Sequence, residues 1–145
     1  MTILFGGSQM EANYVVIDGT LYGALSGNAW SNLGQASDIW DPTGLLNADV
    51  GLANLLTNFA NPQVRADEMV DGVNTVRVDG TVTADAVNKI FPELAANAPV
   101  PSTAWIRPDT DALVQLTLQP HAGQSIQFNL SAWGKAVTIT RPPGV

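Results

Sequence analysis

The sequence predicts an α+β fold in which a largely antiparallel sheet carries two short helices. Apolar and polar residues alternate through much of the chain, as in residues 10–17 and 113–118, and this period of two indicates strands. Asp-Gly pairs separate several alternating runs, and this dipeptide supplies the positive φ angles of a tight hairpin turn. Two other segments place apolar residues at helical spacing. Half-polar strands joined by hairpins are typical of an antiparallel sheet with one face in solvent.

The expected strands follow one another as hairpins. Asp18-Gly19 and Asp71-Gly72 are predicted turns between strands, and a third pair, Asp79-Gly80, is expected to lead into residues 81–83. The chain opens on a strand-like run at 2–5 with no earlier segment to pair with it. The expected strands are 2–5, 10–17, 20–25, 64–70, 74–78, 113–118, 125–130 and 136–140.

Two helices interrupt this pattern. Residues 47–59 carry apolar side chains near helical spacing, and Asn61-Pro62 follows them as a stop signal. The segment 83–94 begins with Thr83 as a candidate cap. Pro92 is expected to end or kink this second helix near Phe91.

Composition narrows the possible functions. Hydrophobic residues make up 46% and charged residues 13% of the 145, which excludes a disordered acidic tail despite the net charge of −7. The acidic balance argues against nucleic acid as a partner. The chain has no Cys, so within it there is no disulfide, no thiolate metal site and no cysteine-linked lipid anchor. Residues 1–7 lack the basic and apolar regions of a signal peptide.

Catalytic motifs are not found. Gly6-Gly7-Ser8-Gln9-Met10 fails the nucleophile-elbow pattern at its last position. The single histidine, His121, lies in a Pro/Gly loop and is expected to be exposed. The clustered aspartates fit turn and helix-start positions better than a calcium loop; these are Asp38, Asp41, Asp49, Asp109 and Asp111. We therefore expect no cofactor and no metal, although a hydrolase using one of these carboxylates stays an open alternative.

Four tryptophans provide a second alternative. Trp30, Trp40, Trp105 and Trp133 lie in separate segments, each next to an expected turn. Packing at the ends of the sheet is the favoured interpretation. Exposed rings also stack on sugars, so a β-rich carbohydrate-binding module remains a candidate function.

Read in order, several segments resemble the LppX/LprA/LprF/LprG lipoprotein family of mycobacteria, and the LprA and LprG branch most closely. The segments are YVVIDGTLY at 14–22, DIWDP at 38–42, GLANLLTNF at 51–59, DGVNTVRV at 71–78, TADAVN at 83–88, PVPSTAWI at 99–106 and LSAWGKAVTI at 130–139. The resemblance spans essentially the whole chain.

The resemblance implies a strongly curved antiparallel half-barrel with short helices over its concave face and a hydrophobic cavity between them. It also implies a non-enzymatic carrier of acylated lipids or glycolipids, of the triacylated glycolipid or triacylglycerol type, in the cell envelope, with envelope lipid-export proteins as possible partners. Family members begin with a signal peptide, a lipidated Cys that attaches them to the membrane, an N-terminal helix and further strands. Met1 falls within a family strand, so residues 1–145 would form one domain, the C-terminal portion of the family fold. A misassigned start is favoured over a truncated paralogue.

Strand parity and helical spacing predict which side chains line such a cavity. From the strands they are Ile3, Phe5, Met10, Ala12, Tyr14, Val16, Leu116, Leu118, Ile126, Phe128 and Val137; from the helices they are Leu52, Leu55, Leu56, Val87, Ile90 and Phe91.

Overall fold

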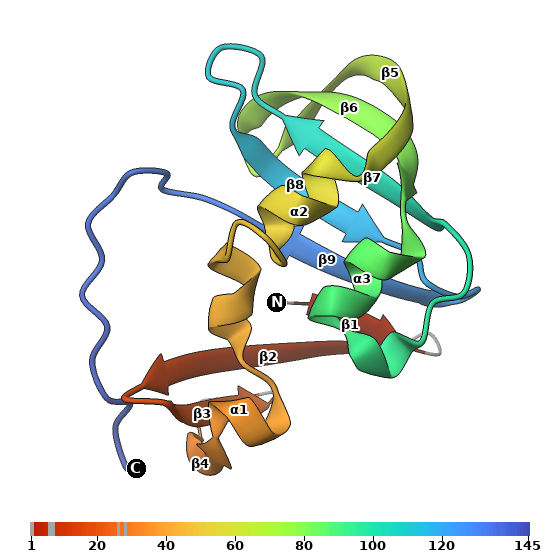
Figure 1. Ribbon diagram of the computed structural model, residues 1–145. Helices are drawn as coiled ribbons and strands as arrows, with labels where there is room; N and C mark the ends of the chain where they lie inside the picture. Colours follow the sequence, from red (N-terminus) through yellow and green to blue (C-terminus); the bar gives the residue numbers. More distant parts are fainter. Residues whose placement is uncertain (1, 6–7, 26, 28) are drawn as a thin grey trace.

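A single curved sheet dominates the computed structural model, which describes residues 2–5, 8–25, 27 and 29–145, with the backbone alone for residues 2–5 and 8–10. In this part of the chain, nine antiparallel strands are ordered β4-β3-β2-β1-β9-β8-β7-β6-β5 (Figure 1). The strands are β1 Thr2–Phe5, β2 Ser8–Ile17, β3 Thr20–Leu25, β4 Ser31–Gln35, β5 Phe59–Val70, β6 Val73–Val82, β7 Val100–Ile106, β8 Leu113–Leu118 and β9 Gln124–Asn129. The helical elements are α1 Ala36–Ile39, η1 Pro42–Leu46, α2 Leu52–Thr57, α3 Ala84–Ile90 and η2 Pro92–Leu94.

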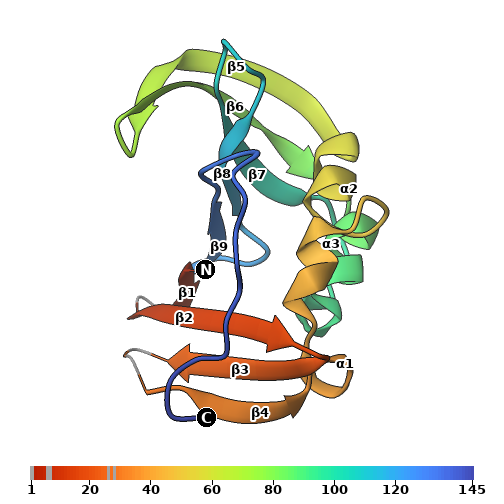
Figure 2. The ribbon, with the colours of Figure 1, turned by 90° about the vertical axis from the view of Figure 1, so that its left-hand side faces the viewer.

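The sheet bends into the predicted half-barrel. Figure 2 shows β5 and β6 arching over one end, β2 to β4 forming the other, and the helices lying on the concave side. Leu55 of α2 and Val87 of α3 are fully buried in one cluster with Leu116 and Leu118 of β8. The helices therefore rest on the middle of the sheet through apolar side chains, and this burial is the main force that holds them there.

The opening strand has no earlier segment to pair with, but later strands pair with it on both sides. Ile3 of β1 lies opposite Met10 of β2 and opposite Ile126 of β9. The strand beside β1 on its second edge is β9, the last strand in the sequence. The order of segments in the sequence does not indicate this pairing. β1 thus joins the N-terminal hairpins to the C-terminal strands.

Two of the three predicted Asp-Gly turns are confirmed. Asp18 and Gly19 have φ of 50° and 77°, and Asp71 and Gly72 have φ of 49° and 79°. Asp79-Gly80 is no turn, because both residues lie inside β6. The reason is in the surroundings: Asp79 is held by side chains of neighbouring strands, and Gly80 lies beneath the ring of Phe59.

The second predicted helix is confirmed more closely than the first. Thr83 caps α3 by accepting a hydrogen bond from the Ala86 amide, and the helix ends at Phe91, just before Pro92. The first predicted helix is shorter than 47–59, since α2 covers only Leu52–Thr57. Asn47 accepts a hydrogen bond from the Asp49 amide at 2.8 Å, and such a local turn competes with helix formation.

The last predicted strand, 136–140, is wrong. Residues 131–145 contain no strand or helix, because β8 and β9 already have partners on both sides. This C-terminal segment instead runs from the end of β9 across to β3 and β4 (Figures 1 and 2). Trp133 Nε1 donates to the Leu113 carbonyl at 2.9 Å, and Arg141 Nη2 donates to the Tyr22 hydroxyl at 2.7 Å. Among the described residues, no helix is long and apolar enough to cross a membrane.

Candidate functional site: an apolar groove at the open end of the half-barrel

A row of aromatic rings crosses the concave side. Tyr14 of β2 meets Trp40 edge-on with ring centroids 5.4 Å apart, and Trp40 stacks on Phe91 at 6.1 Å. Phe91 in turn stacks on Phe128 of β9 at 6.0 Å. Contacts of this geometry add to the free energy of burial. The row therefore links the N-terminal strands, the helices and β9 into one apolar interior.

Most of the predicted lining residues gather in this interior. Of the helical set and the later strands, eight belong to the buried cluster: Leu55, Val87, Ile90, Phe91, Leu116, Leu118, Ile126 and Phe128. Ala12 is buried, whereas Tyr14, Val16 and Leu52 are half-buried. The side chains of Ile3, Phe5 and Met10 lie outside the described residues.

Val137 does not lie with the other predicted lining residues. Its segment forms no strand, and its side chain is 74% exposed. The alternation of apolar and polar residues could not predict the position of this side chain. Alternation assigns a side chain to one face of a sheet only if its segment is a strand of that sheet.

Open space adjoins the buried cluster at the end of the half-barrel where the C-terminal segment leaves β9. One cavity of about 450 Å³ lies between β9 and the η1 and α2 region. Its lining is Glu11, Pro42, Leu45, Leu46, Leu52, Gln127, Phe128, Asn129 and Leu130. Leu46 is 85% exposed, so apolar surface reaches the rim of this cavity.

A larger cavity of about 840 Å³ lies next to the first and shares Asn129 and Leu130 with it. Its remaining lining is Leu56, Asp71, Val73, Arg107, Thr110, Asp111, Ala112, Leu113, Val114, Ser131, Ala132 and Trp133. We call the two neighbouring cavities the Leu130 groove. Ligand pockets typically measure about 300–1,000 Å³, so the groove has room for a sizeable molecule.

The sequence placed only part of this groove. Leu52, Leu56 and Phe128 were predicted and do line it, while Ile90 lines a separate hollow of about 200 Å³ beside Trp40. Leu130 was missed, although it continues the Ile126 and Phe128 parity of β9 and could have been found that way. Leu46 was missed, and Trp133 was considered only as a sugar contact, because a 3-10 turn and an irregular segment have no simple apolar period.

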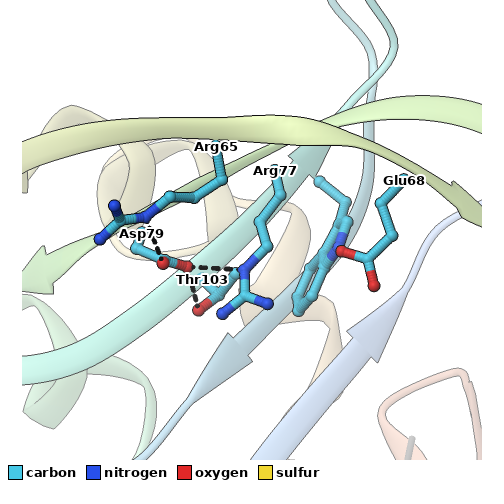
Figure 3. Close-up of polar contacts among 6 residues, drawn as sticks. Arg65, Glu68, Arg77, Asp79 and Thr103 are labelled. Atoms are coloured by element: carbon cyan, nitrogen blue, oxygen red, sulfur yellow. Dashed lines mark hydrogen bonds and ion pairs between the residues drawn. The ribbon is translucent and has the colours of Figure 1, made fainter.

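One cluster of charged side chains lies away from the groove. On the opposite, convex face, Arg65 Nε and Arg77 Nε donate to Asp79 at 3.0 and 2.9 Å, and the Thr103 hydroxyl donates to it at 3.1 Å (Figure 3). The hydrogen bond from Arg77 contributes most to lowering the pKa of Asp79 below its usual range. Nearby, Trp105 Nε1 donates to Glu68. This network fastens β5, β6 and β7 together rather than forming a pocket.

Two of the acidic residues noted in the sequence, Asp41 and Asp109, have structural contacts. Asp41 accepts from the Thr43 amide at the start of η1, and Arg107 pairs with Asp109. His121 is exposed, with Nε2 3.4 Å from the Leu94 carbonyl oxygen. Over residues 2–5, 8–25, 27 and 29–145, the structure brings together no group of three or more His, Asp or Glu side chains that could hold a metal ion.

Comparison with known proteins gives consistent relatives. The LppX_LprAFG lipoprotein family model matches residues 1–139. The lipoarabinomannan carrier protein LprG of Mycobacterium tuberculosis H37Rv is 46% identical over 142 residues, which are 97% of this chain and 60% of that protein. LprG of Mycolicibacterium smegmatis is 48% identical over 141 residues, which are 97% of this chain and 60% of that protein. The chain thus spans about three fifths of the length of these curated relatives.

Solved structures agree with the fold. The crystal structure of LprF from Mycobacterium bovis matches with a TM-score of 0.75 and 30% identity, covering 94% of this chain and 67% of LprF. The crystal structure of the Mycobacterium tuberculosis lipoprotein LppX matches with a TM-score of 0.64 and 28% identity, covering 96% of this chain and 70% of LppX. The family match, the curved sheet and the helices on its concave side together show that this chain belongs to the LppX/LprA/LprF/LprG lipoprotein family.

Proposed function

We propose that this chain binds the acyl chains of a lipid or glycolipid in the Leu130 groove and carries that lipid within the cell envelope. The observation that carries the proposal is the groove itself: two neighbouring cavities beside an apolar core, with Leu46 and Leu56 at their rims. Membership of a family whose relatives include lipoarabinomannan carriers supports it. Triacylated glycolipids and triacylglycerols are the lipid classes proposed, and no catalytic step is part of the proposal.

Hydrophobic burial is sufficient for such binding. Each methylene removed from water contributes about 0.8 kcal/mol, so a sixteen-carbon chain offers on the order of 12 kcal/mol before the costs of association. The leucines around Phe128 supply that apolar contact, although Glu11 also lines the same cavity. One domain comprising residues 1–145 would form this binding part, and envelope export proteins would be its partners in transfer.

Filling the groove tests the proposal. Leu130 is shared by both cavities and packs on the core, so Leu130→Trp should occupy space that an acyl chain needs. We expect at least a tenfold loss of affinity for a fluorescent fatty-acyl probe, measured by titration and by the lipid extracted from the purified protein.

Leu94→Trp is the matched control. Leu94 also packs on the core while partly exposed, but it lines neither cavity of the groove. Both variants should keep the native circular dichroism spectrum. Equal probe binding by Leu130→Trp and the unchanged protein would contradict a lipid site in the groove.

A further inference from the structure

The chain after β9 crosses the end of the half-barrel where the Leu130 groove lies. Both views show this stretch running from β9 to β3 and β4 (Figures 1 and 2). We call its residues 134–140 the strap. Every residue of the strap is exposed, and residues 136–140 make no hydrogen bond to any other residue that the structure describes. The position of the strap is therefore not fixed by the sheet.

The two ends of the strap are fastened to the body of the protein. Before the strap, Trp133 Nε1 donates to the Leu113 carbonyl at 2.9 Å. After it, Arg141 Nη2 donates to the Tyr22 hydroxyl at 2.7 Å, and Pro142 is buried. Because the strap is held at both ends and free between them, it can bend toward the groove without unfolding any strand.

The first end of the strap contains a turn that can act as a hinge. The Lys135 amide donates to the Ala132 carbonyl, and Gly134 has a φ of 74°, which glycine adopts at little cost. Trp133 lies on the wall of the 840 Å³ cavity. Val137 follows four residues later, and four residues span at most about 14 Å. A short bend at this turn would therefore bring Val137 to the groove.

The strap carries two apolar side chains that nothing covers in the described part of the chain. Val137 is 74% and Ile139 63% exposed. They alternate with Thr138 and Thr140, so in an extended segment Val137 and Ile139 point to the same side. Contact with an acyl chain would remove both from water. The groove is open to such contact, since Leu46 at its rim is 85% exposed.

We propose that the strap is a lid, which bends onto a lipid held in the Leu130 groove and covers its acyl chain with Val137 and Ile139. This inference rests on the proposed function, because the lid closes only on a bound lipid. The strap adds apolar contact on the side that the groove walls leave open. Its main effect is to slow the escape of the acyl chain into water.

Spin labelling tests whether the strap meets the lipid. The chain contains no Cys, so a single introduced Cys carries the only label. Val137→Cys reports on the strap. Val64→Cys is the matched control, because Val64 of β5 is 71% exposed and lines neither cavity of the groove. When diacylglycerol is added, the label at residue 137 should become less mobile and less accessible to a water-soluble nickel complex, while the label at residue 64 should not change.

Dissociation rates test whether the lid retains the lipid. Val137→Ser/Ile139→Ser should release a fluorescent diacylglycerol about tenfold faster, because two apolar contacts are lost. Val64→Ser/Met69→Ser is the matched control, since it removes two exposed apolar side chains from β5 that lie away from the groove. Its release rate, measured by stopped-flow transfer to an excess of vesicles, should equal that of the unchanged protein.

Other results would overturn the inference. Lipid binding that leaves the label at residue 137 as mobile and accessible as before would contradict the lid and leave the acyl groove standing. So would equal release rates in Val137→Ser/Ile139→Ser and the unchanged protein. An equal change at residue 64 would also reject the lid, because it would reflect the whole molecule. Failure of the unchanged protein to bind diacylglycerol would reject the carrier function and the lid with it.

Discussion

At the scale of single residues, the convex face shows how exposed polar groups hold strands together. Asp79 lies on β6 and accepts from Arg65 of β5, Arg77 of β6 and Thr103 of β7. Each exposed ion pair is worth little alone, but one carboxylate joins three strands here. The sequence could not show this, since Asp79-Gly80 reads as a turn.

Asp79→Asn should reduce the free energy of unfolding by about 1 kcal/mol at neutral pH, because it removes the charge that these donors share. The pKa of Asp79 is lowered in the folded state. Its stabilisation is therefore present above the pKa of the unfolded chain and disappears as the pH falls through the lower, folded pKa. Urea unfolding at a series of pH values checks this. A difference between the two proteins that persists at the acid end would contradict the assignment.

Gly80 provides the second residue-scale prediction. A Cβ built at this position would lie 2.7 Å from the Ala60 carbonyl oxygen and would also meet the Phe59 ring. Gly80→Ala should therefore cost about 2 kcal/mol through overpacking, measured by thermal unfolding. Gly72→Ala is not a suitable control because its φ is positive, but Gly44→Ala is, since a Cβ there meets nothing within 4 Å. A smaller loss for Gly80→Ala than for Gly44→Ala would contradict the close approach.

At the scale of elements, the C-terminal segment shows what alternation cannot decide. Residues 136–140 read as a strand, yet they pair with no strand of the sheet and are exposed. By contrast, residues 113–118 were predicted with the bounds that β8 has. The local pattern was enough to predict a strand where a neighbouring strand was there to pair with it. The path of the C-terminal segment depends instead on the side-chain hydrogen bonds of Trp133 and Arg141.

Tyr22→Phe should loosen this segment. Tyr22 is 2% exposed, and its hydroxyl accepts from Arg141 Nε and Nη2 at 3.2 and 2.7 Å. Loss of the acceptor removes two bonds worth roughly 1 kcal/mol each, so limited proteolysis within residues 135–145 should become at least fivefold faster while β7 to β9 stay protected. Tyr14→Phe is the control, because it keeps the ring contact with Trp40 and does not touch Arg141. Equal cleavage rates in both variants would show that the tether contributes nothing.

At the scale of the whole molecule, the family resemblance predicted the half-barrel, while strand parity and helical spacing predicted most of the buried interior but only part of the groove. Parity found Leu116, Leu118, Ile126 and Phe128 because they lie on regular strands. Leu46 and Trp133 depend on how irregular segments cross the open end, which is a tertiary property. The pairing of β1 with β9 likewise joins the two ends of the sequence, and no local pattern indicates it.

Native mass spectrometry of the purified chain, after incubation with a diacyl lipid, tests the central claim most directly. The account predicts a folded ion heavier by the mass of one lipid, with that adduct lost in Leu130→Trp and kept in Leu94→Trp. A folded ion at the mass of the bare protein, at lipid concentrations far above those that saturate a carrier, would contradict the claim that the Leu130 groove holds acyl chains.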